Sequence, residues 1–301
     1  MKAQRKSLFP GLIFNADDLG IHPAISAGIL SAYRKGMLTS CTMLMTTDYL
    51  EETLRDYVRP AALPIGIHLS LTLGKAAMPV RDVPDLVNED GSFKLHAGRL
   101  LFRRFVGEAG TSLLSQIQRE FEAQLARAHD GGLRPTHADS HQHVHMNPAI
   151  FRVVEKLLPR FGISRMRVTR ESFSWAAFGP DFPDTMRRLN PIKWALLRAR
   201  AAMIKPTLAV PDDFFGVLYS GMVSKSAVLR AIAAASKAKA FEICMHPGFP
   251  APKGQSFYPV QGYNDFISSA TRQTEHDILL DDELAAMVKK RGLVLRGYDG
   301  C

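Results

Sequence analysis

The sequence predicts an α/β fold in which parallel strands form a barrel or an incomplete barrel with helices outside it. Short apolar runs alternate with segments of helical periodicity along the 301 residues, and this βαβ order is typical of parallel strands. Acidic and imidazole side chains also stand at the ends of several apolar runs, and the carboxyl ends of barrel strands share one face. We expect one domain over residues 1–301, with substrate-determining insertions near 74–110 and 172–212.

Predicted strands and helices alternate from the start of the chain. The run Leu12–Phe14 opens a strand near 12–17. A helix over 22–35 is expected next, because Pro23 suits an early helical position and Gly36 the position just past the end. Further apolar runs predict strands near 39–46 and 65–71, with a helical pattern between them at 48–57.

The alternation continues after a long polar excursion. Ile117, Phe121 and Leu125 recur at every fourth position, which predicts a helix over 113–128. Other helical patterns lie near 148–161, 224–236 and 281–291. Apolar runs predict the remaining strands near 136–141, 166–169, 214–219, 241–246 and 293–298.

The composition suits a globular protein, since 46% of the residues are hydrophobic and 22% are charged. The net charge of +9 indicates either solubility or an anionic partner, such as a phospholipid surface or nucleic acid. Cys41, Cys244 and Cys301 are scattered and form no CxxC pair, which favours a reducing compartment without disulfides. The basic start is followed by an apolar run too short for a signal peptide, and no segment is long enough to span a bilayer. We therefore expect a cytoplasmic protein.

Two adjacent carboxylates, Asp17 and Asp18, stand at the end of the first strand. Like charges side by side repel each other and lose hydration, so the pair persists most easily where a cation or a reacting group takes up the charge. Side chains alternate along a strand, but a strand end that turns can aim both into one pocket, and Gly20 relieves a turn just after them. The structural alternative is that Asp18 caps the helix beginning near Pro23.

Two later segments supply imidazoles. His68 lies in an apolar strand, where a lone histidine is more often a hydrogen-bonded core residue than a ligand. In an extended chain, five side chains of the segment 136–145 would share one face: His137, Asp139, His141, His143 and His145. Because Pro148 begins a helix soon after, we do not expect all five to do so, and spacing alone leaves open which imidazole binds a metal. The alternative is a solvated histidine-rich loop.

One carboxylate and two imidazoles would leave open positions on a divalent ion. This donor set fits zinc best, with iron, magnesium, cobalt, nickel and manganese as alternatives. The ion would polarise a carbonyl and lower the pKa of a bound water, and the unligated carboxylate could act as general base. His246, held at a strand end by Pro247 and Gly248, is either a general acid to a leaving amine or a structural turn residue.

Four segments together resemble the YdjC-like carbohydrate deacetylases of the chitooligosaccharide deacetylase type. They occur in the family's order, as Asn15-Ala-Asp-Asp-Leu-Gly, Gly66-Ile-His-Leu-Ser-Leu-Thr, Thr136-His-Ala-Asp-Ser-His-Gln-His-Val-His and Met245-His-Pro-Gly-Phe. Two positions depart from the family's frequent pattern, with Leu19 in place of Phe and Gln142 in place of His. Neither departure removes a proposed ligand.

The resemblance implies a (β/α) barrel-like fold and metal-dependent removal of an N-acetyl group from an amino sugar. Carried over by motif, the expected metal ligands are Asp18, His68 and His141. Asp17 is the expected general base and His246 the expected general acid, while Asp139 is expected to orient a ligand or the acid. Further residues expected beside the ligands or the substrate are Asn15, His143 and His145. A homodimer is expected by family analogy only.

The segment from Thr185 to Pro211 is basic and apolar and holds no acidic residue. Asn190-Pro191 predicts a helix start and Pro206 its stop. Aliphatic side chains and Trp interleaved with Lys and Arg are typical of an interfacial helix on anionic lipid, and the alternative is a covering helix with solvated charges. The expected membrane or lipid contacts are Arg187, Arg188, Lys193, Trp194 and Arg198.

Some relatives of the family resemble enzymes acting on polyprenyl-phosphate-linked or hopanoid-linked amino sugars. A lipid-linked sugar is therefore the preferred substrate, and we expect peripheral contact of the protein with the inner face of the membrane.

Other functions compete with this one. A soluble chitooligosaccharide deacetylase would use the same chemistry. A phosphoesterase would need more carboxylate ligands than the motifs place, and a ferrous oxygenase would need redox-active iron. A non-catalytic protein binding membranes or polyanions would close a structural metal with four ligands. Nucleic acid is the less favoured partner, because no binding motif accompanies the charge.

Overall fold

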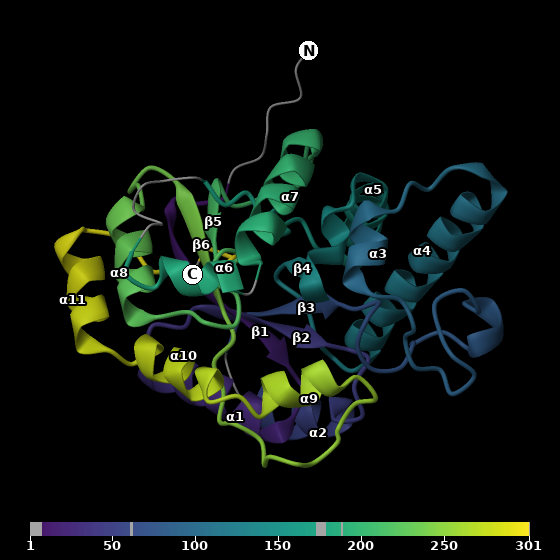
Figure 1. Ribbon diagram of the computed structural model, residues 1–301, viewed down its shortest axis with the longest axis horizontal. Coiled ribbons are helices and arrows are strands. Elements are labelled where there is room, and N and C mark those ends of the chain that lie inside the picture. Colours follow the sequence, from purple (N-terminus) through teal and green to yellow (C-terminus); the bar gives the residue numbers. More distant parts are fainter. Residues whose placement is uncertain (1–7, 61–62, 173–178, 188, 301) are drawn as a thin grey trace.

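A six-stranded parallel sheet forms the centre of the computed structural model, which describes residues 8–60, 63–172, 179–187 and 189–300 (Figure 1). The strands are β1 Gly11–Leu19, β2 Ser40–Leu44, β3 Ile65–Leu69, β4 Ala138–Ser140, β5 Asp213–Phe215 and β6 Ala240–Met245. They lie in the order β4-β3-β2-β1-β6-β5, and every ladder is parallel. The sheet is an incomplete barrel surrounded by helices, which confirms the expected fold class.

Helices connect the strands and cover the sheet. Those of the first half are α1 Pro23–Lys35, α2 Leu50–Thr53, α3 Ala97–Phe102, α4 Gly107–Asp130 and α5 Pro148–Leu157. Those of the second half are α6 Phe182–Arg187, α7 Asn190–Met203, α8 Lys225–Ala234, α9 Gln261–Ile267, α10 Thr271–Leu279 and α11 Asp282–Lys290. Every residue of β1, β2, β3, β4 and β6 is buried, as expected for a parallel sheet covered on both faces.

Two predicted strands are wrong. Residues 166–169 form no ladder, because the segment makes only isolated bridges, Met166 with Ala138 and the preceding Arg165 with Ala209. Residues 293–298 form a single bridge, with Leu12. The β1–β2 ladder begins only at Asn15, so the start of β1 has one free edge for this bridge.

Several expected elements differ in length or were not expected. The strand expected over 136–141 is limited to β4, and 3-10 turns follow it over His141–Met146. The helix expected over 48–57 is α2 continued by a π-helix at Leu54–Val58. No element was predicted for α3, α6, α9 or α10. No helix in the described ranges has both the length and the apolar composition that a bilayer crossing needs.

Candidate active site

A bulge in β1 turns two consecutive carboxylates to the same side. β1 pairs regularly with β2 as far as Ala16, and the ladder resumes only at Leu19 with a shifted register. Between them Asp18 adopts a φ of +73°, in the left-handed region that non-glycine residues rarely occupy. Strand side chains otherwise alternate, so this turn brings Asp17 and Asp18 together. The side chain of His22, not Asp18, caps α1.

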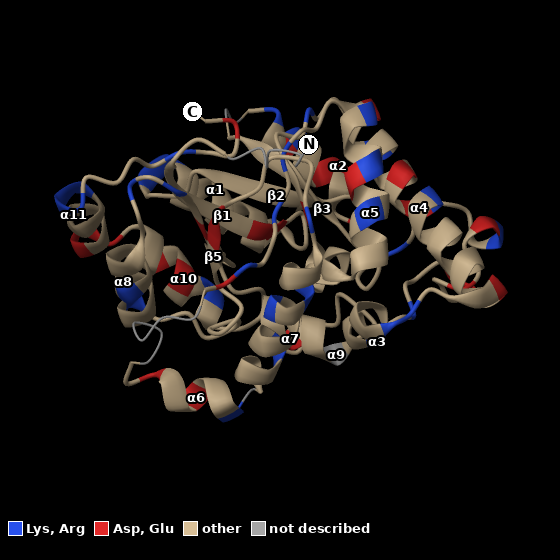
Figure 2. Cartoon of the chain, turned by 90° about the horizontal axis from the view of Figure 1, so that it is seen from above, with Lys and Arg blue, Asp and Glu red and all other residues tan. Residues whose placement is uncertain are grey.

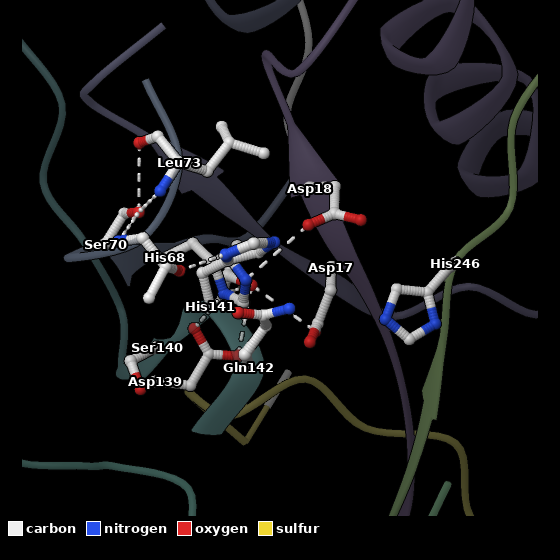
Figure 3. A network of polar contacts seen from close by, with 12 residues as sticks. Asp17, Asp18, His68, Ser70, Leu73, Asp139, Ser140, His141, Gln142 and His246 are labelled. Atoms are coloured by element: carbon white, nitrogen blue, oxygen red, sulfur yellow. Dashed lines mark hydrogen bonds and ion pairs between the residues drawn. The ribbon is translucent and has the colours of Figure 1, made fainter. Parts of the chain in front are cut away.

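A polar cavity of about 540 Å³ opens at the carboxyl ends of the strands. Its wall includes the five side chains expected from the motifs: Asp17, Asp18, His68, His141 and His246. Figure 3 shows these side chains close together; Asp17 and Asp18 come from β1, His68 from β3, and His141 and His246 from just after β4 and β6. Parallel strands present their carboxyl ends at one edge of the sheet, and the fold therefore assembles residues that are far apart in sequence.

His68 is oriented by a buried carboxylate. Its Nδ1 lies 2.6 Å from Asp139 Oδ1 and 3.1 Å from Thr42 Oγ1, and its Nε2 faces Asp18 Oδ1 at 3.6 Å. Burial acts to lower the pKa of His68, but the carboxylates, Asp139 foremost, outweigh it and raise the pKa to about 9. A histidine held in this way through Nδ1 presents Nε2 as a metal ligand.

His141 reaches the cavity because the chain turns sharply after β4. The residues that follow it, Gln142 and His143, have φ of 54° and 59°. Its Nδ1 is held 2.8 Å from Thr72 Oγ1, and its ring meets that of His68 edge to face, with 5.8 Å between centroids. Burial lowers the pKa of His141 to about 3, so the imidazole is neutral, which is the form that binds metals.

The other histidines of the cluster have different surroundings. His137 is buried, stacks on Tyr298 with 3.8 Å between centroids, and lies 3.1 Å through Nε2 from Asn15 Oδ1. His145 is buried and bonds within the protein through both nitrogens. His143 lines the cavity, and its buried Nδ1 has no hydrogen-bond partner among the described residues. The extended face therefore divides between cavity and core, because the strand ends after three residues.

A buried arginine holds the candidate general base. Arg167 donates to both oxygens of Asp17 at 2.7 Å and also contacts Asp139 at 2.5 Å and Glu242 at 2.6 Å. Asn15 Nδ2 donates to Asp17 at 3.0 Å. Burial would raise the pKa of Asp17, but the guanidinium outweighs it and holds this pKa well below its usual range. One cation thus compensates three buried carboxylates, which would be unpaired without it.

Helix α10 supports the opposite wall. Arg272 Nη2 donates to Asp18 Oδ2 at 2.9 Å. Glu275 Oε2 accepts the backbone N–H of His246 at 2.5 Å and lies 4.0 Å from its Nδ1. Burial lowers the pKa of His246 to about 4 and raises that of Glu275 to about 7. The imidazole of His246 is therefore neutral near pH 7 and must gain a proton before it can donate one.

Ligand-type atoms also gather elsewhere at this edge of the sheet. In the described part of the chain, the only groups whose ligand-type atoms all lie within 4.8 Å of one another are Asp17, His68 and Asp139, and Asp17, Cys244 and His246; the set Asp18, His68 and His141 does not converge this closely. Two members of the first group, Asp17 and Asp139, are paired with the guanidinium of Arg167, whose charge opposes a second cation there. In the second, burial raises the pKa of the Cys244 thiol well above its usual value, and a neutral thiol is a poor ligand.

Sequence reasoning missed four charged residues of the site: Arg167, Glu242, Arg272 and Glu275. Glu242 interrupts the apolar run 240–245, and Arg167 stands between Met166 and Val168 in a strand-like segment. A charge inside a buried run needs a partner, and this signal could have found them. Arg272 and Glu275 lie on α10, in a polar stretch where charged residues are common, so their sequence surroundings carry no such signal.

The residues expected to contact lipid lie in different environments: some are exposed, and others line the cavity or contact protein groups. Arg188 lies outside the described residues. Arg187 is exposed and pairs with an acidic residue one turn earlier on α6, whereas Lys193 lines the polar cavity. Arg198 donates to a backbone carbonyl at 3.0 Å and lies over the ring of Trp194, 5.6 Å from its centroid. Membrane contact by this segment stays a prediction.

The fold and site together define an α/β incomplete-barrel protein with a buried carboxylate and imidazole centre at the carboxyl ends of its strands. Residues 11–290 match the model of the YdjC-like protein family. The chain belongs to this family, which confirms the resemblance seen in the four motifs.

Relatives match over nearly the full length. The chain is 30% identical over 290 residues to a carbohydrate deacetylase of Geobacillus stearothermophilus, covering 95% of this chain and 96% of the relative. It is 31% identical over 291 residues to a chitooligosaccharide deacetylase of Serratia marcescens, covering 95% and 97%. The crystal structure of a "putative cellobiose-phosphate cleavage protein" from Enterococcus faecalis V583 has a TM-score of 0.70 at 28% identity, covering 98% of both chains.

Proposed function

We propose that the protein is a carbohydrate N-deacetylase, which hydrolyses the acetamide of an amino sugar with the help of one divalent cation. The observation that carries this proposal is the convergence of five side chains in one polar cavity: Asp17, Asp18, His68, His141 and His246. The names of the relatives from Geobacillus stearothermophilus and Serratia marcescens support the class of reaction.

The donor set fits a divalent cation held by Asp18, His68 and His141. One oxygen of Asp18 is fixed by Arg272, and the other faces His68 Nε2 at 3.6 Å. The second ring nitrogen of each imidazole is already held, by a carboxylate for His68 and by a hydroxyl for His141, an arrangement typical of metal-binding histidines. One carboxylate with two imidazoles favours zinc, with magnesium, cobalt, nickel and manganese as alternatives.

The protein's own residues supply proton transfer on either side of the acetamide. When bound, the cation would polarise the acetamide carbonyl and lower the pKa of a water molecule. Asp17, ionised and held in one orientation by Arg167, accepts a proton from the attacking water. His246, after taking up a proton, delivers it to the amine as the C–N bond breaks, while the oxygen of the attacking water stays on the acetyl carbon. Asp17 then returns its proton to solvent, and the products are acetate and a free amino sugar. A low pKa makes Asp17 a weak base. It can therefore accept a proton from a water molecule only if the bound cation lowers the pKa of that water.

The substrate is an acetylated amino sugar, either a free chitooligosaccharide or a sugar joined to a lipid. Both present the same acetamide to the cavity. The expected homodimer and the cytoplasmic location stay predictions.

Acetate release tests the proposal. The purified protein is stripped with a chelator, reloaded with zinc and incubated with N,N′-diacetylchitobiose and with lipid-linked N-acetylglucosamine. We expect acetate and free amine in equal amounts from the zinc-loaded protein, and little from the stripped protein. A protein that binds the metal but releases no acetate from any of these sugars would refute the proposal. Hydrolysis of a phosphate ester by the same preparation, lost in Asp17→Asn, would favour the phosphoesterase alternative.

A further inference from the structure

Lys193 connects the catalytic cavity to the neighbouring surface. It lies on the first turn of α7, where Asn190 anchors the helix by donating to the carbonyls of Leu218 and Ser220 at 3.0 and 3.2 Å. Its side chain lines the polar cavity together with Asp17 and the other candidate catalytic groups. No carboxylate in the described ranges lies within ion-pair distance of its ammonium. The cavity therefore carries one cationic group that the proposed hydrolysis does not use.

A second cavity, of about 390 Å³, continues from the first between α3 and α7. Figure 2 shows α3 and α7 on the same side of the molecule. The two cavities share four lining residues: Ala97, Gly98, Gln142 and Lys193. Because these residues lie on the wall of both, the two spaces meet at Lys193.

The second cavity differs from the first in chemistry. We call it the α3–α7 groove, and its apolar lining consists of Leu101, Phe102, Leu189, Ile192, Leu196 and Leu197. Several of these side chains are open to solvent: Leu189 is 63% exposed, Ile192 56% and Phe102 46%. Arg200 also lines the groove and lies over the Phe102 ring, 5.7 Å from its centroid. An exposed cluster of large apolar side chains next to a polar site is typical of a ligand-binding surface.

We propose that the α3–α7 groove binds the hydrocarbon chain of the substrate, and that Lys193 binds an anionic phosphate between this chain and the acetylated sugar. The order of chemistry along the surface carries the inference: a polar cavity for the sugar, a cation where the two cavities meet, then an apolar groove. Phosphate esters pair with lysine as a point charge, and a hydrocarbon chain gains free energy from leaving water. This inference rests on the proposed deacetylation and names the substrate class of the same site.

Three substrates of increasing complexity test the groove. They are N,N′-diacetylchitobiose, N-acetylglucosamine 1-phosphate and the farnesyl ester of N-acetylglucosamine 1-phosphate, the last used below its critical micelle concentration. We expect kcat/KM for the farnesyl ester to exceed that for the chitobiose by about 10-fold or more, mainly through KM, which corresponds to about 1.4 kcal/mol. Equal kcat/KM values, with acetate released from all three substrates, would overturn the inference and leave the deacetylase function standing. A gain that appears only above the critical micelle concentration would indicate adsorption to a lipid surface and would also overturn it.

Variants separate the two contacts. Ile192→Glu places a charge in the groove and should lower the ratio of kcat/KM between the farnesyl ester and the chitobiose by about 10-fold. Lys193→Gln should lower the kcat/KM of both phosphate-bearing substrates, relative to that of the chitobiose, by a similar factor.

Met186→Glu is the matched control, because Met186 is 56% exposed on α6 and does not line the groove. It should leave all three kcat/KM values unchanged. Far-ultraviolet circular dichroism and thermal melts confirm that each variant is folded. Ratios unchanged by Ile192→Glu would overturn the groove assignment, and no acetate from any substrate would refute the proposed function itself.

Discussion

Arg167 donates a hydrogen bond of 2.7 Å to each carboxylate oxygen of Asp17, although the two residues are 150 positions apart in the sequence. The guanidinium and the carboxylate are both almost completely buried. A bidentate pair of this kind fixes the plane of the carboxylate as well as its charge. Asp17 therefore has a set orientation toward the cavity before any substrate enters.

Replacing Arg167 by Lys keeps a positive charge but removes the fork that holds Asp17. Because the guanidinium is the main group that lowers the pKa of Asp17, we expect this pKa to rise. The acidic limb of the kcat/KM profile should then move to higher pH, with kcat lowered by about 10- to 100-fold. Steady-state rates of acetate release from pH 4 to pH 9 check this.

Arg167→Met serves as the comparison for stability. It leaves three carboxylates without their cation, so we expect a loss of about 3–5 kcal/mol in the free energy of unfolding, measured by urea denaturation. An unshifted pH profile in Arg167→Lys, in a protein that is folded, would contradict the positioning role.

Asp17→Asn and Asp18→Asn should separate catalysis from metal binding. The first removes the proton acceptor and should lower kcat by about 10²- to 10⁴-fold with the metal still bound. The second weakens the only carboxylate ligand proposed, so the metal content itself should fall. Elemental analysis after dialysis, alongside acetate release, checks both. Loss of metal from Asp17→Asn rather than from Asp18→Asn would reverse the two assignments.

Thr72→Val removes the hydroxyl that holds His141 Nδ1 at 2.8 Å while keeping the shape of the side chain. Loss of such a supporting contact should weaken zinc affinity by about 10-fold, as measured by competition with a chromophoric chelator. Thr46→Val is the control, since Thr46 is also buried but donates to the Leu73 carbonyl rather than to an imidazole. Equal affinities in the two variants would argue against His141 as a ligand.

Glu171 makes stability depend on pH. Burial raises its pKa to about 7 from 4.5, although its carboxyl group accepts N–H bonds from Val217 and Leu218 at 2.9 and 3.1 Å. Between these two values the folded state binds the proton more tightly than the unfolded state. The free energy of unfolding therefore falls as pH rises from about 4.5 to 7, by at most about 3 kcal/mol.

Glu171→Gln cannot ionise and should show a smaller fall over this window in urea unfolding at pH 5 and pH 7.5. Glu108→Gln, on an exposed position of α4, should behave as the parent protein does. Identical slopes for the parent and Glu171→Gln would contradict the raised pKa.

The sequence pattern determined the parallel α/β architecture and pointed to Asp17, Asp18 and His246 at strand ends, and the family resemblance added His68 and His141. Two apolar runs end close to candidate catalytic residues, since Asp17 and Asp18 come shortly after Phe14 and His246 follows Met245. Strand ends can be recognised from local pattern, and the carboxyl ends of parallel strands must meet at one edge. This is why residues from four distant motifs could be assigned to one site before their geometry was known.

Only the tertiary structure decided which histidines reach the cavity and which charges support it. His137 and His145 belong to the same motif as His141, but His137 lies before β4 and stacks on the buried Tyr298, and His145 lies in the turns after β4 and bonds to Ser140 in the core. Arg272 reaches Asp18 across 254 residues. Local spacing carries no record of such contacts, because they depend on how helices pack over the sheet and on which buried charges must find partners there.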